Sequence, residues 1–124
     1  MNKKNVVFVV DDNSCVRNGL TRLLSAAGFD VKSFPSSREF LDAFYFPEVS
    51  GCLILNIGMP GIQDEELLDE LNTRHPGLSI IVITADDNPE IRQQADRMKA
   101  SEFFHKPVDG MALIDSIKWA MRSS

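Results

Sequence analysis

The chain has 124 residues, of which 44% are hydrophobic and 25% charged, and its formal net charge is −5. This length suits one domain with a single core, and the composition lacks the polar stretches typical of disorder. The longest apolar runs, Val6–Val10 and Leu78–Ile83, are far shorter than the ~20 residues of a membrane span. We therefore expect residues 1–124 to form one cytoplasmic domain without a membrane segment. Its negative charge also argues against direct nucleic-acid binding.

The two cysteines, Cys15 and Cys52, are not spaced like metal ligands. Each adjoins an apolar segment in which a small buried thiol would fit. We therefore expect both to be structural, and the chemistry of the chain is to be sought elsewhere.

Apolar, β-branched runs alternate with segments of helical period, and no internal repeat is visible. This alternation predicts repeated strand–helix units around a parallel sheet. The expected strands are Val6–Val10, Phe29–Phe34, Cys52–Leu55, Leu78–Ile83 and Glu102–His105. The first is a continuous apolar run ended by two acids, which suits a central strand buried on both faces.

Two helices are expected in the first half of the chain. The first begins at Ser14 and stops at Gly28. Its apolar stripe consists of Val16, Leu20, Leu23, Leu24 and Ala27. The second opens with a capping box, Ser36–Glu39, and continues through Phe40, Leu41 and Phe44.

Three more helices follow in the second half. The third carries a leucine stripe and ends near His75–Gly77; the stripe is Leu67, Leu68 and Leu71. The fourth starts with Pro89 at its first position and has a thin apolar face, so we expect it to be weakly buried and able to move; that face is Ile91, Ala95 and Met98. The fifth is capped by Asp109, and Trp119 is expected to pack against its neighbours; its stripe is Met111, Ile114, Ile117, Ala120 and Met121.

Together these elements predict an α/β fold of the type (βα)5. Right-handed crossovers make it a doubly wound, five-stranded parallel sheet with helices on both faces. In such flavodoxin-like sheets a ligand binds at the carboxyl ends of the strands, near the point where the strand order reverses.

Polar residues gather at that predicted edge. Asp11 and Asp12 follow the first strand, Asn56 the third, Thr84 the fourth and Lys106 the fifth. Carboxylate and amide oxygens are hard ligands of the kind that Mg²⁺ accepts. The lysine ammonium and the threonine hydroxyl favour an anion such as a phosphoryl group. Each residue alone also has an ordinary structural explanation, but together they indicate one phosphate-and-metal site.

Four segments, in chain order, resemble the signatures of response regulator receiver domains, which have the CheY-like fold. They are Val7–Asp12, Leu53–Gly61, Ile83–Ala85 and His105–Pro107. The resemblance covers nearly the whole chain and is strongest to the FixJ-like receivers of LuxR-type transcription regulators. It implies a signalling domain rather than an enzyme, a sensor histidine kinase as partner, and control of an attached output that binds DNA.

The resemblance also implies the role of each site residue. Asp11 and Asp12 match the acidic pair that binds Mg²⁺, with Asn56 at the phosphoacceptor position and Gly58 supplying a backbone carbonyl to the metal. Lys106 matches the lysine that pairs with the phosphoryl group.

Two further positions match the receiver switch. Thr84 matches the switch hydroxyl, and Phe103 the aromatic residue that swings inward when that hydroxyl moves. We therefore expect a phosphorylation signal to pass through these two residues to the fourth helix.

Asn56 departs from the family pattern, because signalling receivers hold aspartate there. A carboxylate oxygen attacks the phosphorus in that reaction, and an amide cannot replace it. We therefore expect this form to be non-phosphorylatable and near the inactive state. Replacing this aspartate by Asn56 removes one anion from the site, which weakens Mg²⁺ binding by about 1 to 4 kcal/mol. The Asn56 amide is expected to donate a hydrogen bond to Asp12. Whether the asparagine is natural or engineered stays open. The loop Ile62–Glu65 also departs from the pattern.

Other functions fit less well. A flavodoxin-type cofactor binder would not present two acids to a phosphate. An aspartyl-phosphate phosphatase would carry Asp-x-Asp after its first strand. A P-loop enzyme is excluded because the glycine-rich motif is missing. The alternative that remains is a natural pseudo-receiver that dimerises or docks a partner without phosphate. Its expected surface is the fourth helix, fifth strand and fifth helix. This surface carries Arg92, Arg97, Glu102 and Lys118.

Overall fold

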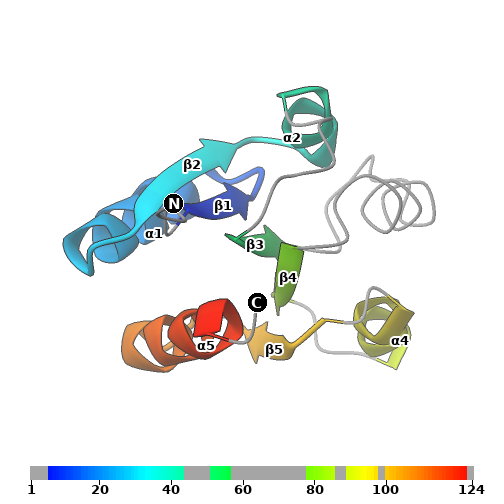
Figure 1. Ribbon diagram of the computed structural model, residues 1–124. Helices are drawn as coiled ribbons and strands as arrows, with labels where there is room; N and C mark the ends of the chain where they lie inside the picture. Colours follow the sequence, from blue (N-terminus) through cyan, green and yellow to red (C-terminus); the bar gives the residue numbers. More distant parts are fainter. Residues whose placement is uncertain (1–5, 44–50, 57–77, 86–88, 98–99, 123–124) are drawn as a thin grey trace.

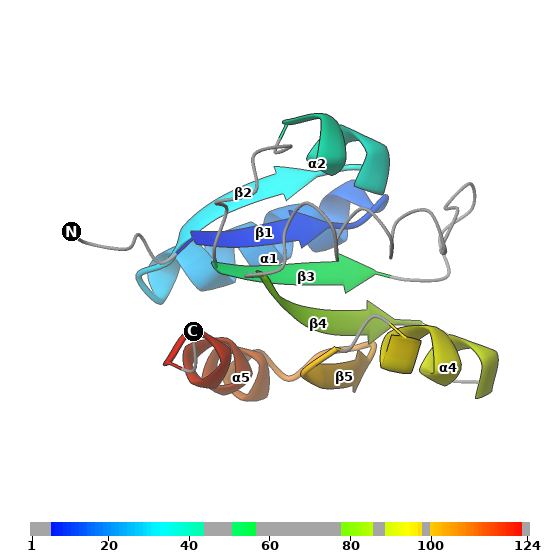
Figure 2. The ribbon, with the colours of Figure 1, turned by 45° about the vertical axis from the view of Figure 1, so that its right-hand side comes forward.

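The computed structural model describes residues 6–43, 51–56, 78–85, 89–97 and 100–122. Five strands form one parallel sheet in the order β2-β1-β3-β4-β5. They are β1 (Val6–Val10), β2 (Asp30–Phe34), β3 (Gly51–Asn56), β4 (Leu78–Thr84) and β5 (Glu102–His105). Figure 2 shows all five arrows pointing the same way, so the carboxyl ends of the strands share one edge. The expected parallel α/β sheet is confirmed.

The strand bounds differ from the prediction by a residue at several ends. β2 begins at Asp30, one residue after Phe29. β3 and β4 each continue one residue further than expected, to Asn56 and Thr84. Both of these polar residues therefore belong to strands, where the sheet's hydrogen bonds fix their backbone.

Helices cover both faces of the sheet. The described ones are α1 (Ser14–Ala26), α2 (Ser37–Ala43), α4 (Pro89–Arg97) and α5 (Gly110–Arg122). In Figure 1, α2 lies beyond β2, and α4 and α5 lie toward the β5 side. The expected helix at Leu67–Leu71, together with Phe44 and Met98, lies outside the described residues.

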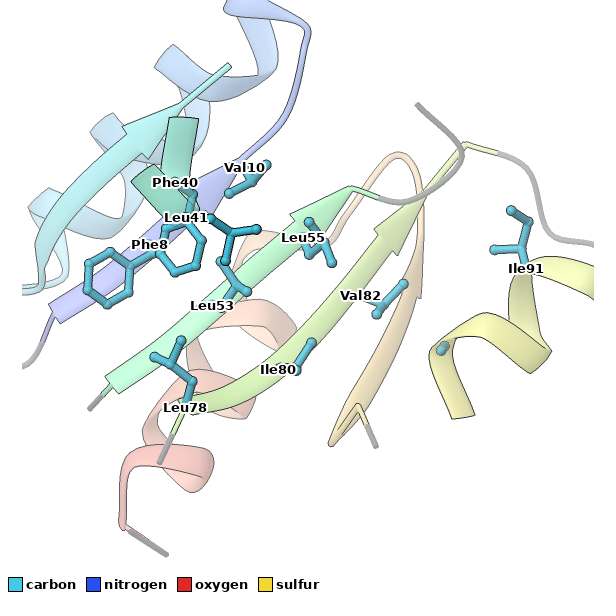
Figure 3. Close-up of a cluster of buried hydrophobic side chains, with 11 residues drawn as sticks. Phe8, Val10, Phe40, Leu41, Leu53, Leu55, Leu78, Ile80, Val82 and Ile91 are labelled. Carbon is cyan, nitrogen blue, oxygen red and sulfur yellow. The ribbon is translucent and has the colours of Figure 1, made fainter. Parts of the chain in front are cut away.

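The two faces carry separate cores, because successive side chains of a strand point to opposite sides. On one face α2 and α4 pack against the sheet, as Figure 3 shows with Phe40 and Ile91 at either end. On the other face α1 and α5 pack against residues such as Val9, Ile54 and Ile83. β1, β3 and β4 are buried on both faces, as their continuous apolar runs predict.

Side chains cap the helices at their starts. The Asn13 side chain accepts hydrogen bonds from the backbone N–H groups of Cys15 and Val16 at 2.9 and 3.2 Å. The Asp109 carboxylate accepts from the Met111 N–H at 3.1 Å, which confirms the expected cap. One half of the expected capping box is seen in the bond from the Glu39 N–H to Ser36 Oγ at 3.1 Å.

Gly28 ends α1 as predicted. Its φ of 98° is in the left-handed region that glycine adopts without steric cost. The N–H of Gly28 bonds to the Ser25 carbonyl and that of Phe29 to the Leu24 carbonyl, at 3.0 and 3.1 Å. These bonds satisfy the last carbonyls of the helix in a Schellman motif.

The expected burial of Cys15, Ala27 and Met111 was wrong, and Trp119 is largely exposed as well. Cys15 is exposed in the first turn of α1, whereas Cys52 is buried as expected. Met111 and Trp119 on α5 are 67% and 70% exposed. They lie away from the sheet because the buried stripe of α5 is formed by other residues, which are Leu113, Ile114, Ile117 and Ala120.

Among the described helices, none combines the length and the apolar character that a bilayer crossing requires. The longest, α1 and α5, have 13 residues each.

Candidate functional site

Buried polar side chains concentrate at the carboxyl edge of the sheet. Among the described residues the buried polar ones are Asp11, Asn56 and Thr84 at this edge, and Ser37 on α2. Burial of a polar group is costly unless it is hydrogen-bonded, so such a concentration needs a reason beyond packing. The three residues come from the ends of three strands, as the sequence predicted.

Asp11 is the centre of the site. It follows β1 directly and is 2% exposed. Its Oδ1 accepts from the Asn13 N–H at 2.9 Å and its Oδ2 from Lys106 Nζ at 3.0 Å. A carboxylate this deeply buried is stable only with such charge-assisted partners.

The turn after β1 is held by backbone contacts as well. The Asp11 N–H donates to the Phe34 carbonyl at 3.2 Å. Arg17 Nη1, reaching back from α1, donates to the Asp11 carbonyl at 2.7 Å. Both backbone groups of Asp11 are therefore satisfied, which fixes the direction of its side chain.

Asn56 ends β3 beside Ile83 of β4 and is 9% exposed. Its Nδ2 donates to Asp11 Oδ1 at 3.4 Å, a long contact. The expected donation to Asp12 is therefore corrected: the side chain bonds to Asp11 instead. The reason is that Asp11 points into the site, whereas the next residue, Asp12, is exposed.

Lys106 brings β5 into the site. Its ammonium forms the ion pair with Asp11, which lies at the end of β1, and β3 and β4 lie between these two strands in the sheet. The Lys106 side chain is 21% exposed and that of Asp11 3%. Its backbone N–H donates to the Thr84 carbonyl at 2.8 Å. The Lys106–Pro107 peptide bond is cis. The lysine thus pairs with an acid of the site in this structure.

Thr84 and Phe103 share one side of the sheet. Thr84 is 1% exposed and lies two residues after Val82, so both side chains point to the α4 side. Phe103 pairs in register with Val82 and packs, half-buried, against the same core. The guanidinium of Arg92 on α4 lies 4.8 Å from the Phe103 ring centroid.

The donor set fits a hard divalent cation. Asp11 and Asp12 supply carboxylate oxygens, and Asn56 can supply an amide oxygen. Gly58, the fourth expected ligand, lies outside the described residues. Among the residues that the structure describes, no cluster of three or more His, Cys, Asp or Glu side chains could hold a metal. A cation here would therefore need the amide or a backbone oxygen.

Two residues of the site escaped the sequence analysis, namely Asn13 and Arg17. Asn13 caps α1 and also donates its N–H to Asp11. An asparagine just before a helical stripe is a known capping signal and could have been found. The bond from Arg17 to the Asp11 carbonyl could not be predicted from the sequence, because arginine is common on the exposed faces of helices.

Comparisons with known proteins agree on one family. The profile of the response regulator receiver domain matches residues 7–118. The chain is 36% identical over 118 residues to the transcriptional regulatory protein FixJ of Azorhizobium caulinodans, covering 95% of this chain and 56% of that protein. The chain spans 50% to 60% of the length of the curated relatives that it matches first.

Solved structures give the same result. The response regulator StyR has a TM-score of 0.85 and 39% identity, covering 98% of this chain and 61% of that chain. FixJ-N has a TM-score of 0.83 and 32% identity, covering 100% of this chain and 98% of that chain.

Proposed function

This chain belongs to the response regulator receiver family, and we propose that it is the receiver domain of a two-component regulator held near its inactive state by Asn56. Family membership confirms the resemblance that the four motifs indicated. The proposal adds the state of this particular chain and the roles of its site residues.

The observation that carries the proposal is the position of Asn56. It lies buried at the end of β3, in hydrogen-bond contact with Asp11, whose other oxygen pairs with Lys106. The phosphoacceptor aspartate of a receiver would stand here. An amide oxygen is a poor nucleophile and forms no stable acyl phosphate, so phosphotransfer to this position is abolished rather than slowed.

The surrounding residues keep the roles expected of a working receiver. Asp11 and Asp12, with Asn56 and the carbonyl of Gly58, would hold Mg²⁺, which supplies charge neutralisation for a phosphoryl group. Lys106 would pair with that group, and Thr84 would donate a hydrogen bond to it. Replacing an anion by Asn56 lowers Mg²⁺ affinity.

With aspartate at position 56, the chain would accept phosphate from a sensor histidine kinase and shift Thr84, Phe103 and α4. The relative FixJ of Azorhizobium caulinodans is a transcriptional regulatory protein longer than this chain. We extend that to an attached output that binds DNA, with the receiver acting as one cytoplasmic domain over residues 1–124.

The test is intact-protein mass after incubation with Mg²⁺ and acetyl phosphate. We expect Asn56→Asp to gain one phosphoryl group and the unchanged chain to gain none. Asn13→Asp is the matched control, since it makes the same chemical change two residues after Asp11, in a side chain that caps α1 rather than at the phosphoacceptor position. If Asn56→Asp stays unmodified, or Asn13→Asp is modified equally, the proposed site is wrong.

A second function follows from the same asparagine. Asn56 cannot accept phosphate, and its amide donates to Asp11, which also pairs with Lys106, so the site is held by the chain's own groups. A pseudo-receiver of this kind would dimerise through α4, β5 and α5, where Arg92, Glu102 and Lys118 are exposed. Sedimentation equilibrium of the chain decides: a dimer that persists without phosphodonor favours this function, and a monomer at all concentrations contradicts it.

A further inference from the structure

Arg92 and Phe103 join α4 to the sheet. The guanidinium carbon of Arg92 lies 4.8 Å from the centroid of the Phe103 ring. A cation over the face of an aromatic ring within about 6 Å of its centroid is attracted by the negative charge of that face. The contact connects a helix to the neighbouring edge strand, and both partners are fixed on regular elements.

α4 buries few apolar side chains, so the contact between Arg92 and Phe103 contributes a larger share of what holds this helix to the sheet. Of the described side chains of α4, Ile91 and Ala95 are buried and the others are exposed. Figure 3 shows Ile91 on α4, beyond Val82 at the end of the cluster. A helix with so little buried area moves at low cost, so a polar contact to the strand influences where it rests.

In the receiver switch of the proposed function, the Phe103 ring turns inward toward Thr84. Phe103 pairs with Val82, and Thr84 follows two residues later on the same side of β4. A ring that turned along the sheet toward Thr84 would leave the guanidinium. We therefore expect an inward turn of the ring to break the contact with Arg92.

We propose that Arg92 is a positioning residue that holds the Phe103 ring against α4 and thereby favours the inactive arrangement. This inference rests on the proposed receiver function, in which Thr84 and Phe103 form the switch. An exposed cation–π contact corresponds to a factor of about two to five in an equilibrium. Arg92 thus tunes the switch rather than locking it.

The contact itself is tested by ¹⁹F NMR of the chain labelled with fluorophenylalanine. The chain has eight phenylalanines, and Phe103→Leu identifies the signal of interest by its loss. We expect Arg92→Gln to shift the Phe103 signal and Arg92→Lys to restore part of the original position. Arg97→Gln, the same charge change on the same helix, should leave it in place. Equal shifts for the two glutamine variants, or none for Arg92→Gln, would overturn the proposal.

The effect on the switch is tested in the Asn56→Asp background with Mg²⁺ and beryllofluoride, a mimic of the phosphoryl group. We expect Arg92→Gln to lower the half-saturating beryllofluoride concentration by a factor of about two to five relative to Arg97→Gln. If Asn56→Asp does not bind beryllofluoride at all, the proposed function fails and this inference falls with it. If it binds and the two variants respond alike, the inference alone is wrong.

Discussion

α1 and α4 are held to the sheet very differently. α1 has 13 residues, a side-chain cap at Asn13 and a fully buried Leu24, and its partly buried Leu20 and Leu23 pack on the same core. α4 has nine residues and buries Ile91 and Ala95 among its described side chains. α1 is therefore packed more firmly against the sheet than α4, and α4, the helix that contacts Phe103, can move at lower cost.

The largest expected effect comes from truncating one buried residue in each of the two helices. We expect Leu24→Ala to lower the free energy of unfolding by about 4 kcal/mol and Ile91→Ala by about 2 kcal/mol. Leu24 is fully enclosed and leaves a cavity, whereas Ile91 lies at the edge of its core, 9% exposed. Urea unfolding measures both. Equal losses would show that α4 is as firmly packed as α1.

The ion pair between Asp11 and Lys106 links the β1 side to the β5 side. We expect Lys106→Met to cost about 3 kcal/mol, at the low end for buried pairs because the lysine is partly exposed. Removing the cation leaves a buried carboxylate without its charged partner. Urea unfolding again gives the value.

Lys118→Met is the control for that variant, because Lys118 is exposed on α5 and should cost less than about 0.5 kcal/mol. Adding Asp11→Asn to Lys106→Met removes the stranded charge and should restore much of the loss. No rescue would mean that the pair contributes through packing rather than charge.

Cys52 is buried in the core on the side of the sheet that α1 and α5 cover, and its thiol makes the stability fall at alkaline pH. Burial raises the pKa of its thiol from 9.0 to about 12. Below pH 9.0 the thiol is protonated in both states, so it has no effect. Above that pH the unfolded chain ionises while the folded chain does not, so stability falls by about 1.4 kcal/mol per pH unit until about pH 12. Cys52→Ala should remove this part of the slope between pH 9 and 10, whereas Cys15→Ala, at an exposed site, should not.

Substitution of Gly19 should change the stability least, and it should raise the stability rather than lower it. It lies inside α1, and a Cβ added there meets no atom within 4 Å. Gly19→Ala should therefore stabilise the chain by up to about 1 kcal/mol through helix propensity. A rise in the thermal midpoint checks it. A fall would show that the space beside α1 is needed by the native state.

Much of the fold followed from local patterns. Val6–Val10 and Glu102–His105 were predicted to the residue, and Pro89 begins α4 as expected. Such patterns are reliable because a strand buried on both faces needs a continuous apolar run and proline suits the first turn of a helix. Met111 escaped this reasoning, because hydrophobicity alone does not say that a side chain faces away from the core.

Periodicity and motifs were enough to predict the order of the strands, the family, and the position of Asp11, Asn56, Thr84 and Lys106 at one edge of the sheet. Parallel strands make that meeting unavoidable once the elements are known. That Asp11 turns inward and accepts hydrogen bonds from both Lys106 and Asn56 was visible only in the folded chain. The same holds for the contact of Arg92 with Phe103. Such contacts depend on distances between elements far apart in the chain, which periodicity within one element does not record.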